Sequence, residues 1–266
     1  MKNLLKKAIG QIPLLDRLQH TNFYRSLRNK SFRDHIRKQR LFYRNILGDD
    51  NRLIFDIGAN VGDHTHIFAR LSDKVVSVEP DNTNAGILKK RFSERKVVVL
   101  QKAVSDAPGT AELHIETNGS AYNTLSEKWV NILEDKDLTR YDQPTKFSDT
   151  VQVETVTLDS LIKEHGRPDF IKIDVEGFEL KVVKGLTTPV PNISIECNLP
   201  EFLEETLNIV TYLKNLDSRY VFNYGNEHQF YLEHYVPADK MLELLRTTEY
   251  RFLEIYVHLN VENAQV

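Results

Sequence analysis

The chain has 266 residues, 41% of them hydrophobic and 27% charged, which fits one large domain or one domain with an appendage. Its single cysteine, Cys197, excludes an internal disulfide, so a reducing compartment is expected. No stretch reaches the ~20 apolar residues of a membrane-spanning helix, and the N-terminus lacks the apolar core of a signal peptide. We therefore expect a cytoplasmic protein.

The net charge of −3 is distributed unevenly along the chain. Residues 1–44 carry twelve Lys or Arg against two acids, a balance of +10 that leaves −13 for the remainder. This segment is also amphipathic, so we expect residues 1–49 to form a basic helical segment ahead of a domain at 50–266. The segment fits a helical cap with solvated charges. Residues 1–44 also suit peripheral contact with an anionic membrane or an acidic substrate.

From residue 50, short apolar strand patterns alternate with helical ones. The alternating strands are expected at 52–58, 74–80, 96–104, 169–177 and 192–198. The helices between them are expected at 63–72, 82–94, 157–166 and 178–186. Two more strands, 110–116 and 150–158, bracket an irregular stretch at 117–149; a helix and strands at 220–225 and 252–259 follow residue 201. This order predicts a Rossmann-like, doubly wound α/β sheet, mostly parallel, with an antiparallel C-terminal edge.

The first strand ends in an unusual turn, Leu53–Thr65, "LIFDIGANVGDHT". Gly58 and Gly62 have no Cβ, so the backbone can turn tightly there and approach a ligand closely. A helix that begins after them would direct its free N–H groups at that ligand. We therefore predict a small-molecule site that includes Asp56, Gly58, Asn60 and Gly62.

Carboxylates follow several of the other strands, where ligands of open α/β sheets bind. The polar side chains at these strand ends include Glu79, Asp106, Asp174, Glu176, Glu196 and Asn198. Such a concentration of negative charge disfavours a pyrophosphate and suits a ligand with a positive centre and hydroxyls. Glu79 can accept two hydrogen bonds from a ribose diol.

Three classes of function remain open from these residues. A nicotinamide-dependent dehydrogenase is opposed by the Asp-x-Gly-x-Asn-x-Gly pattern, which is not the dinucleotide fingerprint. S-adenosyl-L-methionine needs ribose and adenine recognition but no diphosphate site, and fits better. A non-catalytic module with a basic membrane- or nucleic-acid-binding arm is the third. Because the chain lacks the aromatic and basic interleaving of a single-strand groove, we expect no nucleic-acid partner.

Four stretches, "FDIGANVGDHT", "VVSVEPD", "VTLDSLI" and "IKIDVEGFELKVVKGL", resemble the FkbM family of S-adenosylmethionine-dependent methyltransferases. The resemblance covers about residues 53–198. It implies a class I methyltransferase sheet and methylation of a hydroxyl on a small molecule, a sugar or a secondary metabolite. It also places an adenine contact at Asp106, although an aspartate that only forms the turn is the alternative. The basic N-terminal segment and the loop at 117–149 lie outside the four matched motifs, so the acceptor stays open.

The catalytic end of the site is expected around Asp174, Glu176 and Glu196. An ionised side chain at the tip of an apolar strand is costly to bury unless it is used or paired; the alternative is a cap for the next helix. Related enzymes that act on catechol-like hydroxyls hold a divalent cation here, so Asp174, Glu196 and Asn198 are candidate Mg²⁺ ligands, although the FkbM resemblance implies no metal. His64 is an alternative base or simply a helix residue.

Overall fold

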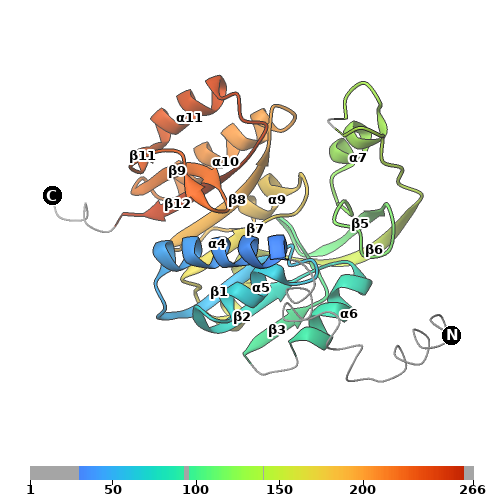
Figure 1. Cartoon of the computed structure of the whole chain (residues 1–266), viewed down its shortest axis with the longest axis horizontal. Helices are drawn as coiled ribbons and strands as arrows, with labels where there is room; N and C mark the ends of the chain where they lie inside the picture. The colour runs from blue at the N-terminus through green and yellow to red at the C-terminus, as the bar shows by residue number, and fades with distance from the viewer. Residues whose placement is uncertain (1–29, 93–95, 140, 261–266) are drawn as a thin grey trace.

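A computed structural model of the chain describes residues 30–92, 96–139 and 141–260. Its main sheet has five parallel strands in the order β3-β2-β1-β7-β8. They are β1 (Asn51–Ile57), β2 (Ser72–Val78), β3 (Val97–Leu100), β7 (Phe170–Ile173) and β8 (Asn192–Asn198). Antiparallel strands continue the sheet beyond β8 (Figure 1). They are β12 (Phe252–Leu259), β9 (Tyr220–Asn226), β10 (Gln229–Phe230) and β11 (Val236–Pro237).

This topology confirms the predicted class I methyltransferase sheet with its antiparallel C-terminal edge. The central strands are apolar and buried on both faces, as parallel strands covered by helices must be. Successive side chains of β1 face opposite layers: Ile54 packs with Phe68 and Tyr43, whereas Phe55 belongs to the core of the other face.

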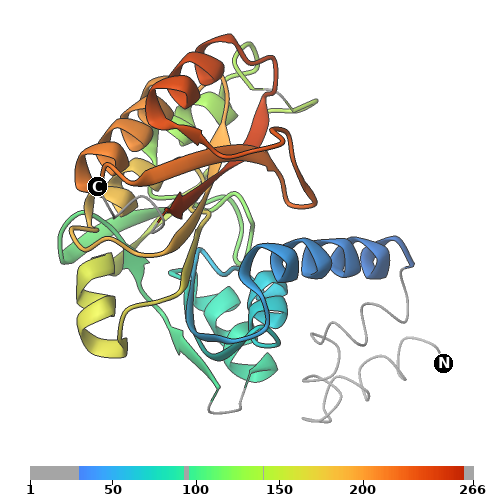
Figure 2. The same ribbon diagram turned by 90° about the vertical axis from the view of Figure 1, so that its left-hand side faces the viewer.

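Helices cover both faces of the sheet (Figure 2). One face is covered by α4 (Lys30–Leu47) and α5 (Asp63–Phe68), with α6 (Asn82–Arg91) beside α5. The other face is covered by α8 (Leu158–His165), α9 (Glu179–Lys184), α10 (Leu203–Leu216) and α11 (Ala238–Thr247). Among the helices that the structure describes, none combines the length and the apolar composition required to cross a bilayer.

A separate lobe extends from the main sheet, on the right in Figure 1. It contains a small sheet of β4 (Ala103–Val104), β6 (Asp149–Val156) and β5 (Gly109–Ile115), and α7 (Glu127–Glu134). The strand predicted at 96–104 is therefore divided, since β3 joins the main sheet and β4 pairs with β6. The stretch predicted to be irregular contains α7, whose N-terminus is capped by the Ser126 hydroxyl.

The basic N-terminal segment was expected to be helical, and residues 30–47 form α4 outside the sheet; residues 1–29 lie outside the described residues. The Tyr43 side chain of α4 is fully buried, with its ring 5.1 Å from that of Phe68 and 5.8 Å from that of Phe170. We propose that the folded domain includes α4, so that the boundary lies before residue 50.

Removal of α4 is therefore expected to destabilise the protein. A chain beginning at Gly48 should aggregate or unfold at lower urea concentration, because it exposes the surface that Phe42 and Tyr43 cover. Tyr43→Ala alone should cost about 3–5 kcal/mol. Leu41→Ala, at a side chain that is 45% exposed on the same helix, should stay within about 0.5 kcal/mol of the parent. Equal urea midpoints for the two variants would show that α4 is only an appendage.

Candidate active site

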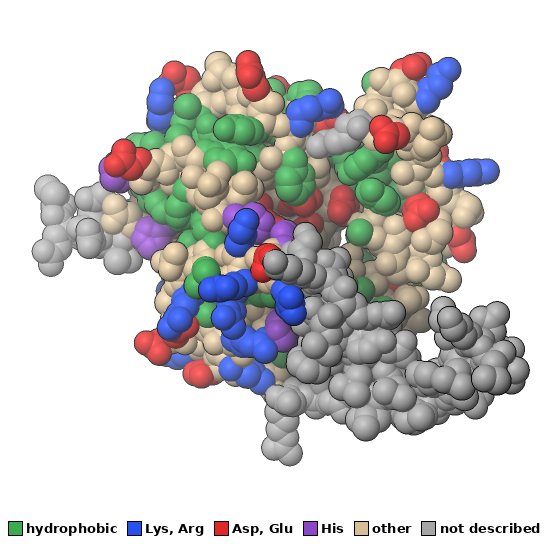
Figure 3. Space-filling model, viewed as in Figure 1, with side chains coloured by type: hydrophobic (Ala, Val, Ile, Leu, Met, Phe, Trp, Pro, Cys, Tyr) green, Lys and Arg blue, Asp and Glu red, His purple; other side chains and the backbone are tan. Residues whose placement is uncertain are grey.

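A hollow lies at the carboxyl ends of the parallel strands, between the main sheet and the lobe, where acidic side chains gather (Figure 3). The strand ends contribute Ile57, Gly58, Asn60, Glu79, Asp174 and Glu196 to its lining. The lobe contributes Ser120, Ala121, Asn123 and Leu125. The hollow therefore lies at the edge of the sheet where the sequence patterns predict a site, and the lobe contributes to its lining.

The glycine turn after β1 has left-handed backbone at three positions: Gly58 (φ 78°), Asn60 (φ 47°) and Gly62 (φ 85°). A Cβ on Gly58 would lie 1.7 Å from the carbonyl oxygen of Asp174, so no larger residue fits. A Cβ on Gly62 would instead meet Leu88 at 2.5 Å. Gly58 and Asn60 thus line the hollow, whereas Gly62 lets α5 pack against α6.

Glu79, the residue predicted to contact the ribose, follows β2 and lines the hollow. One carboxylate oxygen accepts from the backbone N–H of Asn60 and the other from that of Asp81, both at 2.8 Å. Burial raises the pKa of Glu79 to about 7, although both hydrogen bonds favour the ionised form. Each oxygen keeps a lone pair for a ligand, and Glu79 also fixes the turn at Asn60.

Besides Gly62, two more of the predicted cofactor contacts do not line this hollow. The buried carboxylate of Asp56 accepts from the Thr65 hydroxyl at 2.5 Å and so connects β1 to α5. Asp106 is exposed at the surface, where the ammonium of Lys181 lies 2.9 Å away and lowers the pKa of the Asp106 carboxyl. From this part of the chain, the residues that line the hollow are instead Lys102, Ala103 and Val104, which follow β3.

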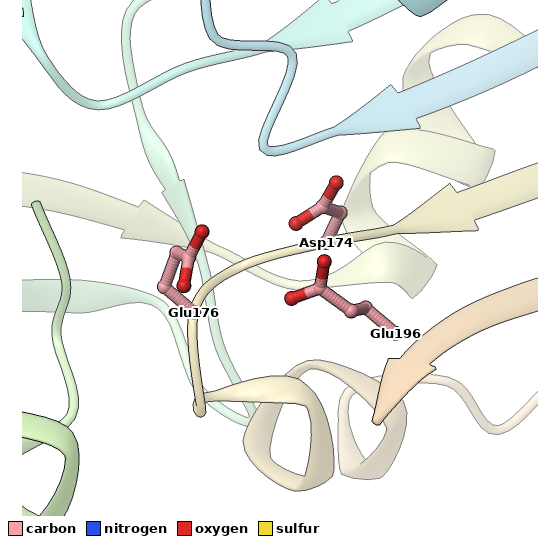
Figure 4. A group of neighbouring side chains, drawn as sticks. All are labelled: Asp174, Glu176 and Glu196. Carbon is pink, nitrogen blue, oxygen red and sulfur yellow. The ribbon is translucent and has the colours of Figure 1, made fainter. Parts of the chain in front are cut away.

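Asp174, Glu176 and Glu196 converge in the hollow, each offering an oxygen within 4.8 Å of the others (Figure 4). Glu176 has left-handed backbone (φ 54°), and the Trp129 indole of the lobe donates to its carboxylate at 3.1 Å. Asn198, the third candidate metal ligand, does not line the hollow, and its amide donates to Glu196 at 3.3 Å. The three carboxylates come from two adjacent strand ends.

Burial and the charges of neighbouring carboxylates raise the pKa values of Glu176 and Glu196. Desolvation, and then the charges of Asp174 and Glu179, raise the pKa of Glu176 to about 8. The pKa of Glu196 is raised as well, chiefly by burial and then by the charge of Asp174. A nearby cation would stabilise the ionised form of these carboxylates and offset the cost of burying their charge. The same carboxylates can also accept a proton.

A second hollow adjoins the first and shares Gly58, Asn60 and Asp174 with it. Its other side is formed by α4, α5 and the turn between β9 and β10. There the His64 imidazole lies 2.9 Å from the carboxylate of Glu227, which also accepts from the Gln39 amide. Burial lowers the pKa of His64, but the charge of Glu227 and its hydrogen bond outweigh that effect, so the pKa is raised overall. Gln39 and Glu227 were not predicted from the sequence.

The comparison with known families decides the assignment. A model of the methyltransferase FkbM domain matches residues 56–220. The chain belongs to the FkbM methyltransferase family. In this FkbM methyltransferase the match begins at Asp56 and ends in β9, so it spans the central strands and lobe but not α4. Among curated proteins no match was found.

Several solved methyltransferase structures are similar to this chain at low identity. The O-methyltransferase from Bacillus cereus in complex with SAH is 16% identical, with a TM-score of 0.43 over 83% of this chain and 80% of that one. The plantazolicin methyltransferase BpumL, also in complex with SAH, is 11% identical, with a TM-score of 0.44 over 97% and 99%. Precorrin-6y C5,15-methyltransferase from Geobacter metallireducens is 9% identical, with a TM-score of 0.44 over 84% and 88%.

Proposed function

We propose that this protein transfers the methyl group of S-adenosyl-L-methionine to a hydroxyl of a small molecule, such as a sugar or a secondary metabolite. The observation that carries the proposal is the hollow itself, in which Glu79, Asp174, Glu176 and Glu196 surround the turn at Gly58. These four carboxylates suit a ligand with a sulfonium, an ammonium group and a ribose diol. A cytoplasmic location and membrane contact through residues 1–44 stay predictions.

The charge of the hollow argues against the nicotinamide alternative. A dinucleotide brings a diphosphate, yet four carboxylates and one ammonium, that of Lys102, line the first hollow. In addition, the turn lacks the three-glycine fingerprint that lets a backbone approach a diphosphate. A purely ligand-binding role is the other alternative; it requires no convergence of Asp174, Glu176 and Glu196, so their juxtaposition favours an enzyme.

The residues divide the work by position. Glu79 would hold the ribose, with the backbone of Gly58 and Asn60 against the donor. S-adenosylmethionine supplies an electrophilic methyl group whose C–S bond breaks as the new C–O bond forms. Asp174, shared by both hollows, would orient the acceptor hydroxyl and take its proton, with Glu176 and Glu196 as neighbours. Because the transfer is an in-line attack, correct placement of the hydroxyl supplies much of the rate.

A divalent cation is a second candidate for this group of carboxylates. Mg²⁺ prefers oxygen ligands, and Asp174, Glu176 and Glu196 would offer three of them. In that case these carboxylates would hold the metal, which would supply Lewis-acid chemistry for activation of the acceptor hydroxyl. The cationic donor accounts for the same carboxylates without a metal, so we assign the acid–base role first and use chelation to separate the two.

The proposal is tested by incubating the full chain with methyl-labelled donor and a panel of sugar, polyketide and phenolic hydroxyls. Transfer of label to a hydroxyl, detected by mass spectrometry of the product, is the expected result. Label found only on nitrogen or carbon atoms of the acceptors would keep methyl transfer and overturn the hydroxyl assignment.

The ribose contact gives a separate prediction on donor affinity. Glu79→Ala should weaken donor binding by roughly 1.5–3 kcal/mol, the value of a charge-assisted hydrogen bond. Since the pKa of Glu79 is about 7 in the free protein, its carboxylate is protonated at lower pH, and donor affinity should fall as the pH drops from 8 to 6. The Glu79 part of this dependence, about tenfold per pH unit below 7, should be absent in Glu79→Gln. Calorimetric titration across this range measures both effects; unchanged affinity in Glu79→Ala would remove Glu79 from the donor site.

A further inference from the structure

Lys172 is an ammonium-bearing side chain buried in the middle of the main sheet. It lies in β7 and is 2% exposed. Alternate residues of a strand point to the same face of the sheet. The side chain of Lys172 therefore lies on the same face as that of Asp174, which follows the strand two residues later. An unpaired ammonium at such a depth would be very costly, and its partners therefore explain why it is there.

Two carboxylates surround the Lys172 ammonium. Its Nζ lies 2.6 Å from Oδ2 of Asp174 and 3.7 Å from Oε1 of Glu254. Glu254 lies in β12 and is 2% exposed, and its other oxygen accepts from the Tyr43 hydroxyl of α4 at 3.4 Å. A continuous polar connection thus runs from α4 through β12 to β7, and it ends at the carboxylate that both hollows share.

The surroundings of Asp174 explain what the ammonium does. Glu176 and Glu196 each place an oxygen within 4.8 Å of an oxygen of Asp174. Carboxylates at such distances repel one another, which favours protonation of one of them or rotation of its side chain away from the others. Lys172 is a buried cation in contact with Asp174, and its short contact holds the carboxylate against that repulsion.

We propose that Lys172 is the positioning residue of Asp174: it holds this carboxylate at the junction of the two hollows, and Glu254 with Tyr43 holds the ammonium in place. The inference rests on the proposed function for its catalytic consequence, though not for its structural one. The closer contact supports it, because a lysine that served only to neutralise Glu254 has no need to approach Asp174 to 2.6 Å.

The test separates positioning from simple charge balance in the core. Lys172→Met leaves Glu254 buried without a cation, so the melting temperature of this variant should fall. Lys172→Met combined with Glu254→Gln removes both core charges, and its melting temperature should recover towards that of the parent. Methyl transfer by the double variant should nevertheless stay about 10²-fold slower, the typical cost of a catalytic group displaced by about 1 Å. Lys172→Arg keeps the charge and should restore part of the rate.

Lys184→Met is the matched control, because this lysine is exposed at the end of α9 and should change neither melting temperature nor turnover. A double variant that transfers methyl at the parental rate would overturn the proposal and leave Lys172 as a core counter-ion. A crystal structure of the double variant gives a readout without activity. We expect the Asp174 side chain to leave its position, and an unmoved Asp174 would contradict the proposal even if the protein methylated nothing.

Discussion

Asp174→Asn is expected to lower turnover by about 10²–10⁴-fold while donor binding persists. Asparagine keeps the shape of the side chain and one acceptor oxygen, but it cannot take the proton of the acceptor hydroxyl. It also loses the charge that the Lys172 ammonium contacts at 2.6 Å. Single-turnover rates at saturating donor measure the chemical step, and calorimetry on the same variant measures donor affinity.

Chelation distinguishes the roles that Asp174 can have. If Asp174 is a base or a clamp, EDTA should leave parental activity unchanged and added Mg²⁺ should not rescue the variant. Loss of parental activity with EDTA, together with partial rescue of Asp174→Asn by Mg²⁺, would assign it as a metal ligand. Full activity in the variant, with or without EDTA, would contradict both and move the chemistry to other residues of the hollow.

Gly58→Ala should be among the most destabilising single substitutions in the protein. The new Cβ would lie 1.7 Å from the backbone oxygen of Asp174, and alanine would also be strained at a φ of 78°. Because the obstacle is backbone of the adjacent β7 end, it cannot rotate away. We expect a loss of more than about 4 kcal/mol in the free energy of unfolding, measured with urea.

Gly86→Ala is the matched substitution for this prediction. Gly86 lies within α6, and a Cβ there would meet nothing within 4 Å. Alanine is the better helix former, so this variant should gain about 0.5–1 kcal/mol. Free energies of unfolding for Gly58→Ala and Gly86→Ala that differ by less than about 1 kcal/mol would show that the turn is not held as tightly as described.

The main sheet could be predicted because its information is local. Runs such as "KVVSV" and "FIKI" specify buried strands, the helices between them impose parallel crossovers, and the topology then brings Glu79, Asp174 and Glu196 to one edge. The amphipathic α11 was overlooked although Met241 and Leu245 have helical spacing and are both buried.

Other features depend on partners far along the chain. Asp106 follows a strand as an adenine contact would, but its side chain pairs with Lys181, which no local pattern reveals. In the sequence, Lys172 is an ordinary polar residue of a strand. Its pairing with Glu254 depends on β12, which is distant along the chain. The lobe likewise lies against the hollow through contacts distant in the chain, such as the hydrogen bonds that Trp129 and Thr124 donate to Glu176.

The most direct test of the central claim is a calorimetric titration of the full chain with S-adenosylmethionine, with NAD⁺ titrated in parallel. We predict saturable binding of the methyl donor, stronger at pH 8 than at pH 6 and weakened by Glu79→Ala, with no binding of the dinucleotide. Binding of NAD⁺ with no heat from the methyl donor would contradict the account.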